Sequence, residues 1–215
     1  FPHFTKENNM GVSDVKVAFI SDEIAADPDG ISASAQVANN AALVIGGALH
    51  VGNAYSSAGS ARKIVVVSGG DDDEISFTVT GTDIEGNALV ETFLGANAGT
   101  ATSTKYFQTV SGISAVGDPA GTVTAGTSAD ALDKVFFGRV RLKGYSIVSG
   151  GTAGVIEFFN GSPNGTGSAL FKARTIGTDN TTVDNTIPLN GIVFEDGLYV
   201  VYTNTTVDMM SFFYA

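Results

Sequence analysis

Residues 74–94 have the sequence EISFTVTGTDIEGNALVETFL, and this stretch decides the fold class. At its start, apolar Ile75, Phe77 and Val79 alternate with serine and threonine, which is the period-two pattern of a strand with one buried face. Residues 81–87 combine aspartate, glycine and asparagine, which favour a turn, and residues 89–94 return to strand-forming side chains. The stretch therefore predicts a β-hairpin whose three apolar side chains face a core.

The same period of two recurs on both sides of this hairpin. Strands are predicted over residues 15–20, 62–68, 105–116 and 121–126, with a bend at Gly112. Short strands separated by turns at this spacing are typical of a β-sandwich. We therefore expect residues 15–128 to form one sandwich domain.

A small, polar segment over residues 126–133 predicts a break between two domains. Strand patterns resume after it, over residues 138–148, 154–159, 169–176, 187–202 and 207–214. About seven or eight strands in roughly 85 residues is the number expected for a jelly roll or a similar sandwich. Residues 129–215 are therefore predicted to form a second, jelly-roll-like β-sandwich domain, which makes the whole chain all-β.

Residues 1–14 have no hydrophobic periodicity, and they include Pro2. We expect them to form an extended arm. An extended segment gains order when it adds to a neighbour's sheet or lies across its surface. Phe1 and Phe4 are therefore candidate partner-contact residues.

The composition excludes several classes of function. The chain has 22 acidic and 11 basic residues, a net charge of −11, which disfavours binding to nucleic-acid phosphates. It contains no cysteine, so disulfide scaffolds, thiol catalysis and cysteine-based zinc sites are excluded. No apolar run approaches the roughly 18 residues that a membrane-spanning helix needs. We therefore expect neither nucleic acid nor membrane as a partner.

No motif predicts a catalytic centre or a cofactor, so none is expected. The sequence has no Gly-x-Ser-x-Gly elbow, no P-loop and no His-Glu-x-x-His pattern. His50 lies in an apolar context and is interpreted as a hydrogen-bonded structural residue. The acidic run Asp71–Glu74 could supply oxygen ligands to Ca²⁺, but it lacks EF-hand spacing. We interpret it as a solvated, charged hairpin tip and predict no metal site.

Charge is divided unevenly along the chain. Residues 1–128 carry 5 basic and 14 acidic side chains, whereas residues 129–215 carry 6 and 8. Arg139, Arg141 and Lys143 alternate with Val140 and Leu142, which predicts a cationic stripe on one face of a strand. The stripe could contact the acidic half of another copy, or it could serve only to block unwanted edge pairing.

The last residues of the chain are aromatic. Phe212, Phe213 and Tyr214 predict a buried final strand. The alternative is that they are exposed, in which case they would indicate a partner interface.

Parts of both halves resemble known virion proteins. The TVTGTD segment at 78–83, the following Gly86-Asn87 and the KYFQTV segment at 105–110 resemble Ig-like modules of tailed-phage virion proteins. The RVRLKGY segment at 139–145 and the GIVFEDGLYV segment at 191–200 are similar to compact β-modules in proteins of marine podovirus type. The resemblance implies an Ig-like first domain, and it transfers no catalytic residue.

The resemblance implies a non-enzymatic structural role on the virion. The expected function is that of a capsid decoration, or cement, protein that binds the major capsid protein or other virion proteins at the capsid surface. A homo-oligomer, either a trimer or a dimer, is expected. A tail, neck or fibre-adaptor protein and a cell-surface carbohydrate-binding adhesin remain alternatives. The candidate contact residues are Arg139, Arg141, Lys143, Phe1 and Phe4.

Overall fold

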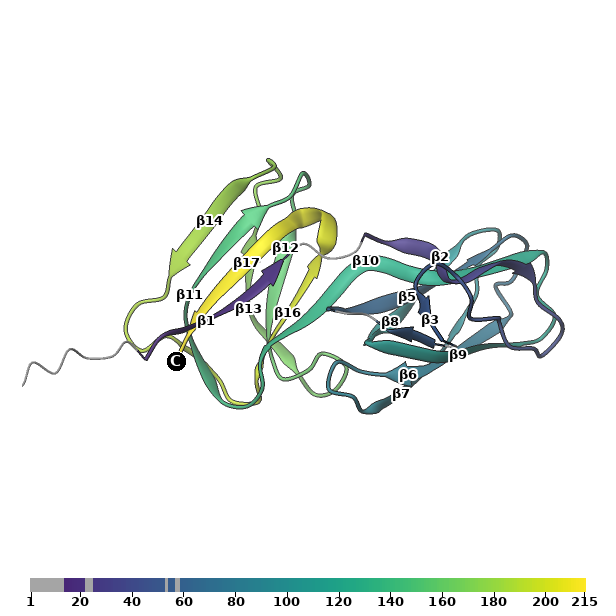
Figure 1. Ribbon diagram of the computed structural model, residues 1–215, viewed down its shortest axis with the longest axis horizontal. Helices are drawn as coiled ribbons and strands as arrows, with labels where there is room; N and C mark the ends of the chain where they lie inside the picture. Colours follow the sequence, from purple (N-terminus) through teal and green to yellow (C-terminus); the bar gives the residue numbers. More distant parts are fainter. Residues whose placement is uncertain (1–13, 22–24, 53, 57–58) are drawn as a thin grey trace, which may run out of the picture.

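The computed structural model describes residues 14–21, 25–52, 54–56 and 59–215, and these segments form two lobes (Figure 1). Strands dominate the described segments, and they pair in three antiparallel sheets. We call these sheets A, B and C. The only helical element of the described chain is the short 3-10 helix η1 (Asn204–Thr206).

Sheets B and C together form the first lobe. Sheet C has the order β3 (His50–Val51), β4 (Ala54–Ser56), β9 (Thr109–Val116), β6 (Ser76–Thr82) and β7 (Ala88–Leu94). It packs against four strands of sheet B: β2 (Asp27–Gln36), β8 (Thr100–Phe107), β5 (Ala61–Ser68) and the first half of β10 (Thr122–Phe136). Phe77, Ile64 and Phe107 are fully buried between the two sheets.

Sheets A and B together form the second lobe. Sheet A has the order β1 (Lys16–Ser21), β17 (Val207–Tyr214), β11 (Val140–Ser149) and β14 (Thr181–Thr186), and β15 (Ile192–Phe194) also pairs with β11. It packs against the rest of sheet B, which comprises β13 (Ser168–Arg174), β12 (Val155–Asn160), β16 (Leu198–Thr203) and the second half of β10. Phe158 lies in this core, stacked on Phe171 at 4.1 Å between ring centroids.

The architecture confirms the all-β prediction with two packed sandwiches. The hairpin predicted from residues 74–94 is present as β6 and β7, paired from Ser76 opposite Leu94 to Thr82 opposite Ala88. Its turn is held by Asp83, whose side chain accepts hydrogen bonds from the N–H groups of Glu85 and Asn87, both at 2.9 Å. The predicted single strand over 105–116 is instead two strands, β8 and β9, which lie in different sheets.

The predicted break over residues 126–133 is wrong. These residues lie inside β10, a single 15-residue strand that runs through both lobes (Figure 1). On one side, β10 pairs with β5 from Val123 to Leu132, and on the other its partner changes from β2 to β16. Small polar residues that favour loops are held extended here because a strand pairs with them on both sides. The lobes therefore share a strand in place of a linker.

The first strand also departs from the predicted domain boundary. Residues 15–20 were expected to belong to the first domain, but β1 pairs with β17, with Lys16 opposite Tyr214 and Ser21 opposite Met209. The second lobe thus contains β1 as well as the strands that follow the first half of β10, and the chain forms the first lobe between them. Most of the predicted arm over residues 1–14, including Phe1 and Phe4, lies outside the described residues.

Candidate interaction surfaces

The cationic residues predicted from the sequence lie on the outer face of sheet A. Val140 and Leu142 are buried, so the alternating side chains of Arg141 and Lys143 face away from the core and are half-buried. Arg139 is exposed just before β11, and its Nε lies 2.6 Å from Glu195 Oε2. Both partners are more than half exposed, so this ion pair adds little stability.

Arg139 differs from the other two cations in having an ion-pair partner. Within the described chain, no ion pair to Arg141 or Lys143 is present, so their charges remain available to a partner. Arg139 also lines a cleft of about 410 Å³ together with Lys16 and Tyr214. The three cations therefore lie close together as predicted, but Arg139 already forms an ion pair with Glu195 within the chain.

Exposed apolar side chains lie beside this stripe. Val17 and Phe19 of β1 are each 59% exposed. Phe213 of β17 lies opposite Val17, and it is 39% exposed. We give the name β1–β17 patch to the exposed apolar residues of these two strands together with Val15, which directly precedes β1; they are Val15, Val17, Phe19, Met209 and Phe213.

The sequence predicted only part of the β1–β17 patch. The aromatic end of the chain was predicted to be buried, and Phe212 is indeed fully buried. Phe213 points to the opposite face, which the alternation of a strand requires. The alternation of Val17 and Phe19 with Lys16 and Ala18 is visible in the sequence, but it does not show which of the two faces packs against the core.

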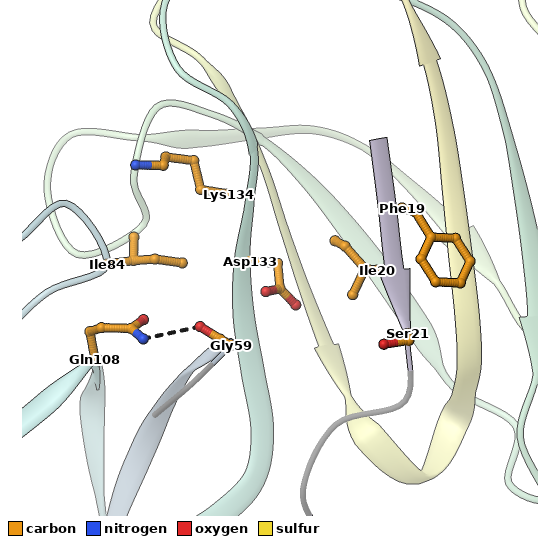
Figure 2. Close-up of a pocket in the computed structure, with 8 residues that line it drawn as sticks. All are labelled: Phe19, Ile20, Ser21, Gly59, Ile84, Gln108, Asp133 and Lys134. Atoms are coloured by element: carbon orange, nitrogen blue, oxygen red, sulfur yellow. Dashed lines mark hydrogen bonds between the residues drawn. The ribbon is translucent and has the colours of Figure 1, made fainter. Parts of the chain in front are cut away.

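A cleft of about 520 Å³ lies where the two lobes meet (Figure 2). Its walls come from β1, from β10 and from loops of the first lobe. The lining residues are Phe19, Ile20, Ser21, Gly59, Ile84, Gln108, Asp133 and Lys134. Gln108 Nε2 donates a hydrogen bond to the carbonyl oxygen of Gly59 at 3.1 Å, which ties two of these loops together.

Asp133 is the buried charged group of this cleft. Its Oδ2 accepts hydrogen bonds from Ser60 Oγ at 2.8 Å and from the Tyr202 hydroxyl at 2.7 Å. Burial raises the pKa of the Asp133 carboxyl, and the two hydrogen bonds together with the charge of Arg62 oppose that rise. Asp133 thus joins residues of both lobes, and its role in the fold accounts for its burial.

Several further contacts fix the lobes relative to each other. Leu132, Tyr106 and Tyr199 form a small apolar cluster at the junction. The Asn164 side chain accepts a hydrogen bond from the Tyr106 N–H at 2.8 Å and donates one to the Tyr106 carbonyl oxygen at 2.6 Å. The Tyr199 hydroxyl donates to Glu85, on the β6–β7 loop of the first lobe. No sequence pattern predicted these contacts, because their partners are far apart in the chain.

Asp71, Asp73 and Glu74 of the acidic run are exposed, as expected for a solvated segment, but the run is not a hairpin tip. Asp71–Glu74 lies in the connection from β5 in sheet B to β6 in sheet C, so it is a crossover between sheets. Asp72 is fully buried, and its Oδ1 accepts a hydrogen bond from the Ala120 N–H at 2.7 Å. Among the described residues, no group of three or more acidic, histidine or cysteine side chains could hold a metal ion.

His50 has the structural contact that was predicted for it. His50 is the first residue of β3, and its Nδ1 lies 2.6 Å from the carbonyl oxygen of Gly47.

None of the described segments forms a helix with the length and apolar character needed to cross a bilayer. No family model matches the sequence, and no curated protein matches it either.

Proposed function

We propose that this protein is a non-enzymatic structural component of a tailed-phage particle, bound to the outside of the capsid as a decoration protein. The observation that carries the proposal is β10, which continues through both lobes and joins them through one shared sheet. A part that stabilises a shell must hold its contacts at fixed angles, and a shared sheet does this better than a flexible linker. The resemblance of segments 78–83, 105–110, 139–145 and 191–200 to virion β-modules supports the same role.

The outer face of sheet A is the proposed contact surface. It combines the apolar β1–β17 patch, along one edge of the sheet, with the cations Arg141 and Lys143 on the adjacent strand β11. Protein interfaces usually combine apolar area with polar and charged groups in this way. The shell protein would bury the apolar side chains and place acidic groups opposite the cations.

The first experiment counts bound copies. Purified protein is added to phage particles that lack it, and the bound copies are measured by quantitative mass spectrometry. Copies in the hundreds are expected for a shell protein. About six to twelve copies, as in a rotationally symmetric ring, would instead indicate a tail or neck protein. Failure to bind any particle would reject the virion role, and selective binding on a glycan array would then favour an adhesin.

A second experiment locates the contact surface. Arg141→Glu is expected to lower particle affinity about tenfold, which corresponds to roughly 1.4 kcal/mol. Arg174→Glu is the matched control, because Arg174 is an exposed arginine of sheet B and lies outside sheet A. Deleting residues 1–14 is also expected to weaken binding. Equal affinities of the Arg141→Glu variant and its control would exclude the outer face of sheet A.

A further inference from the structure

β1 presents a free edge at one side of sheet A. β1 pairs with β17 on one side, and no described strand pairs with its other side. Backbone N–H and C=O groups of alternate residues along Lys16–Ser21 therefore point away from the sheet. Such an edge is a template for another strand unless something covers it.

Another edge in the same protein shows what such a cover looks like. β8 is the last strand of sheet B, and side chains occupy its edge. The Glu91 carboxylate accepts hydrogen bonds from the N–H groups of Thr104 at 2.8 Å and Lys105 at 2.9 Å. Asn164 covers Tyr106 in the same way. Among the described residues, no side chain makes corresponding bonds to Lys16–Ser21.

The side chains of β1 do not protect the edge either. Natural edges are usually blocked by several charges, by proline or by a bulge. β1 contains a single charged residue, Lys16, no proline, and a pairing with β17 that is regular along all six residues. By contrast, the β14 strand at the opposite side of sheet A is polar along most of its length. The edge of β1 is therefore suited to pairing.

We propose that β1 pairs in antiparallel orientation with β1 of a second copy of this protein. The twofold axis then lies midway between the Ala18 residues of the two copies. The two five-stranded A sheets then form one continuous sheet. The outer faces of both copies lie on the same side of it, so the two β1–β17 patches become one larger apolar face. This goes beyond the proposed virion role, which does not require a dimer.

We place the centre of the seam at Ala18. Opposite residues in an antiparallel pair must lie on the same face, which any twofold register centred on a residue satisfies, and the register centred on Ala18 brings residues 16–20 of both strands into the seam. Val17 then lies opposite Phe19 of the partner subunit, a β-branched and aromatic pair of the kind that stabilises sheets. Lys16 lies opposite Ile20 of the partner subunit, so the two ammonium groups are at opposite ends of the seam.

The charge distribution favours a second copy in this arrangement. Residues 22–128 carry 3 basic and 12 acidic side chains, so the first lobe would repel another first lobe. β1 belongs to the second lobe and runs towards the junction, where Ser21 lines the interlobe cleft (Figure 1). Because the partner strand runs in the opposite direction, the two acidic lobes lie beyond opposite ends of the seam.

The expected affinity is modest. A ladder of about five residue pairs supplies roughly four to six main-chain hydrogen bonds. The area that a single strand pair buries is well below the roughly 800 Å² per partner of a standard interface, so the dissociation constant should be in the micromolar range or weaker. The dimer should therefore form at high protein concentration or at the high local concentration of an assembly.

Sedimentation of the purified full chain tests the pairing. At subunit concentrations up to about 0.5 mM, far above a micromolar dissociation constant, we expect a reversible dimer. Phe19→Lys should give a monomer, since it places a charge in the seam, and its side chain is exposed, so folding should persist in circular dichroism. Thr182→Lys on β14 is the matched control and should still dimerise.

Cross-linking tests the register. The chain has no cysteine, so Ala18→Cys introduces a single thiol, and oxidation should yield a covalent dimer. Thr182→Cys should not cross-link. A wild-type chain that stays monomeric would overturn the proposal, as would a dimer that Phe19→Lys does not weaken. Loss of the dimer on deleting residues 1–14 would also overturn it. Particle binding is measured separately, so either proposal can fail alone.

Discussion

The contact between Asn164 and Tyr106 leads to a quantitative prediction about the junction of the lobes. Asn164 lies between β12 and β13 in the second lobe, and its side-chain amide pairs with both backbone groups of Tyr106 in β8. Tyr106 is only 7% exposed, so water has little access to replace this pairing. Asn164→Ala removes both hydrogen bonds and leaves the backbone groups of Tyr106 without these partners.

The expected cost follows from these two bonds. Each hydrogen bond contributes a net of about 0.5–1.5 kcal/mol, and an unpaired buried group costs more than a paired one gains. We therefore expect Asn164→Ala to lower the free energy of unfolding by about 2 kcal/mol. For a chain of this size, that corresponds to a fall in Tm of roughly 4–8 °C. Asn164→Asp should cost at least as much, because it places a carboxylate oxygen against the Tyr106 carbonyl.

Urea unfolding at 25 °C, followed by far-UV circular dichroism and by tyrosine fluorescence, measures this cost. The chain has six tyrosines and no tryptophan, so the fluorescence signal comes from tyrosine alone. Asn39→Ala is the control, since Asn39 is exposed and its side chain bonds only to the neighbouring Asn40. The control should change stability by less than about 0.5 kcal/mol. If the Asn164→Ala and Asn39→Ala variants are equally stable, the amide pairing does not hold the lobes together.

Three other substitutions, one of them with a matched glycine control, test the fold and its pH dependence. Burial raises the pKa of Asp133 above the ordinary value of 3.8, so the folded chain loses stability as the pH rises above that value and the carboxyl must ionise. Asp133→Asn removes this titration, so its free energy of unfolding in urea titrations should rise relative to that of the wild type as the pH rises above 3.8, and a difference that does not change with pH would contradict this. Gly126→Ala would overlap the backbone of β2 and should cost roughly 3 kcal/mol, whereas Gly112→Ala, with open space around its Cβ, should cost under about 1 kcal/mol in the same titrations. Phe158→Ala leaves a cavity in the second core and should lower the free energy of unfolding by about 3–5 kcal/mol, as measured by thermal unfolding. A decrease below about 1 kcal/mol would refute tight stacking of Phe158 on Phe171.

The features that the sequence predicted correctly are local ones. The β6–β7 hairpin depends on the alternation around Phe77 and Val79 and on a turn whose hydrogen bonds span four residues or fewer. The outward direction of Arg141 likewise follows from the burial of its neighbours Val140 and Leu142. In each case the relevant interaction lies within a few residues of the pattern that predicts it.

The features that the sequence missed depend on distant partners. β10 stays extended through Gly126 because strands from elsewhere in the chain flank it, and its own small polar residues favour a loop. β1 finds its partner, β17, at the other end of the chain. The ion pair of Arg139 with Glu195 and the pairing of Asn164 with Tyr106 also join residues more than fifty positions apart. Periodicity carries no information about such pairings.

The pairing of β10 with β5 is irregular between Thr127 and Ala131, where β10 passes from one lobe to the other. Strands twist by a roughly constant angle, so the rotation of one lobe against the other accumulates along this single ladder. Removing one residue there would reverse the face on which the later side chains of β10 lie relative to the first half of the strand, because side chains alternate at every step. The orientation of the two lobes thus depends on the number of residues in this part of β10. We therefore expect insertions and deletions here to disturb the fold more than substitutions do.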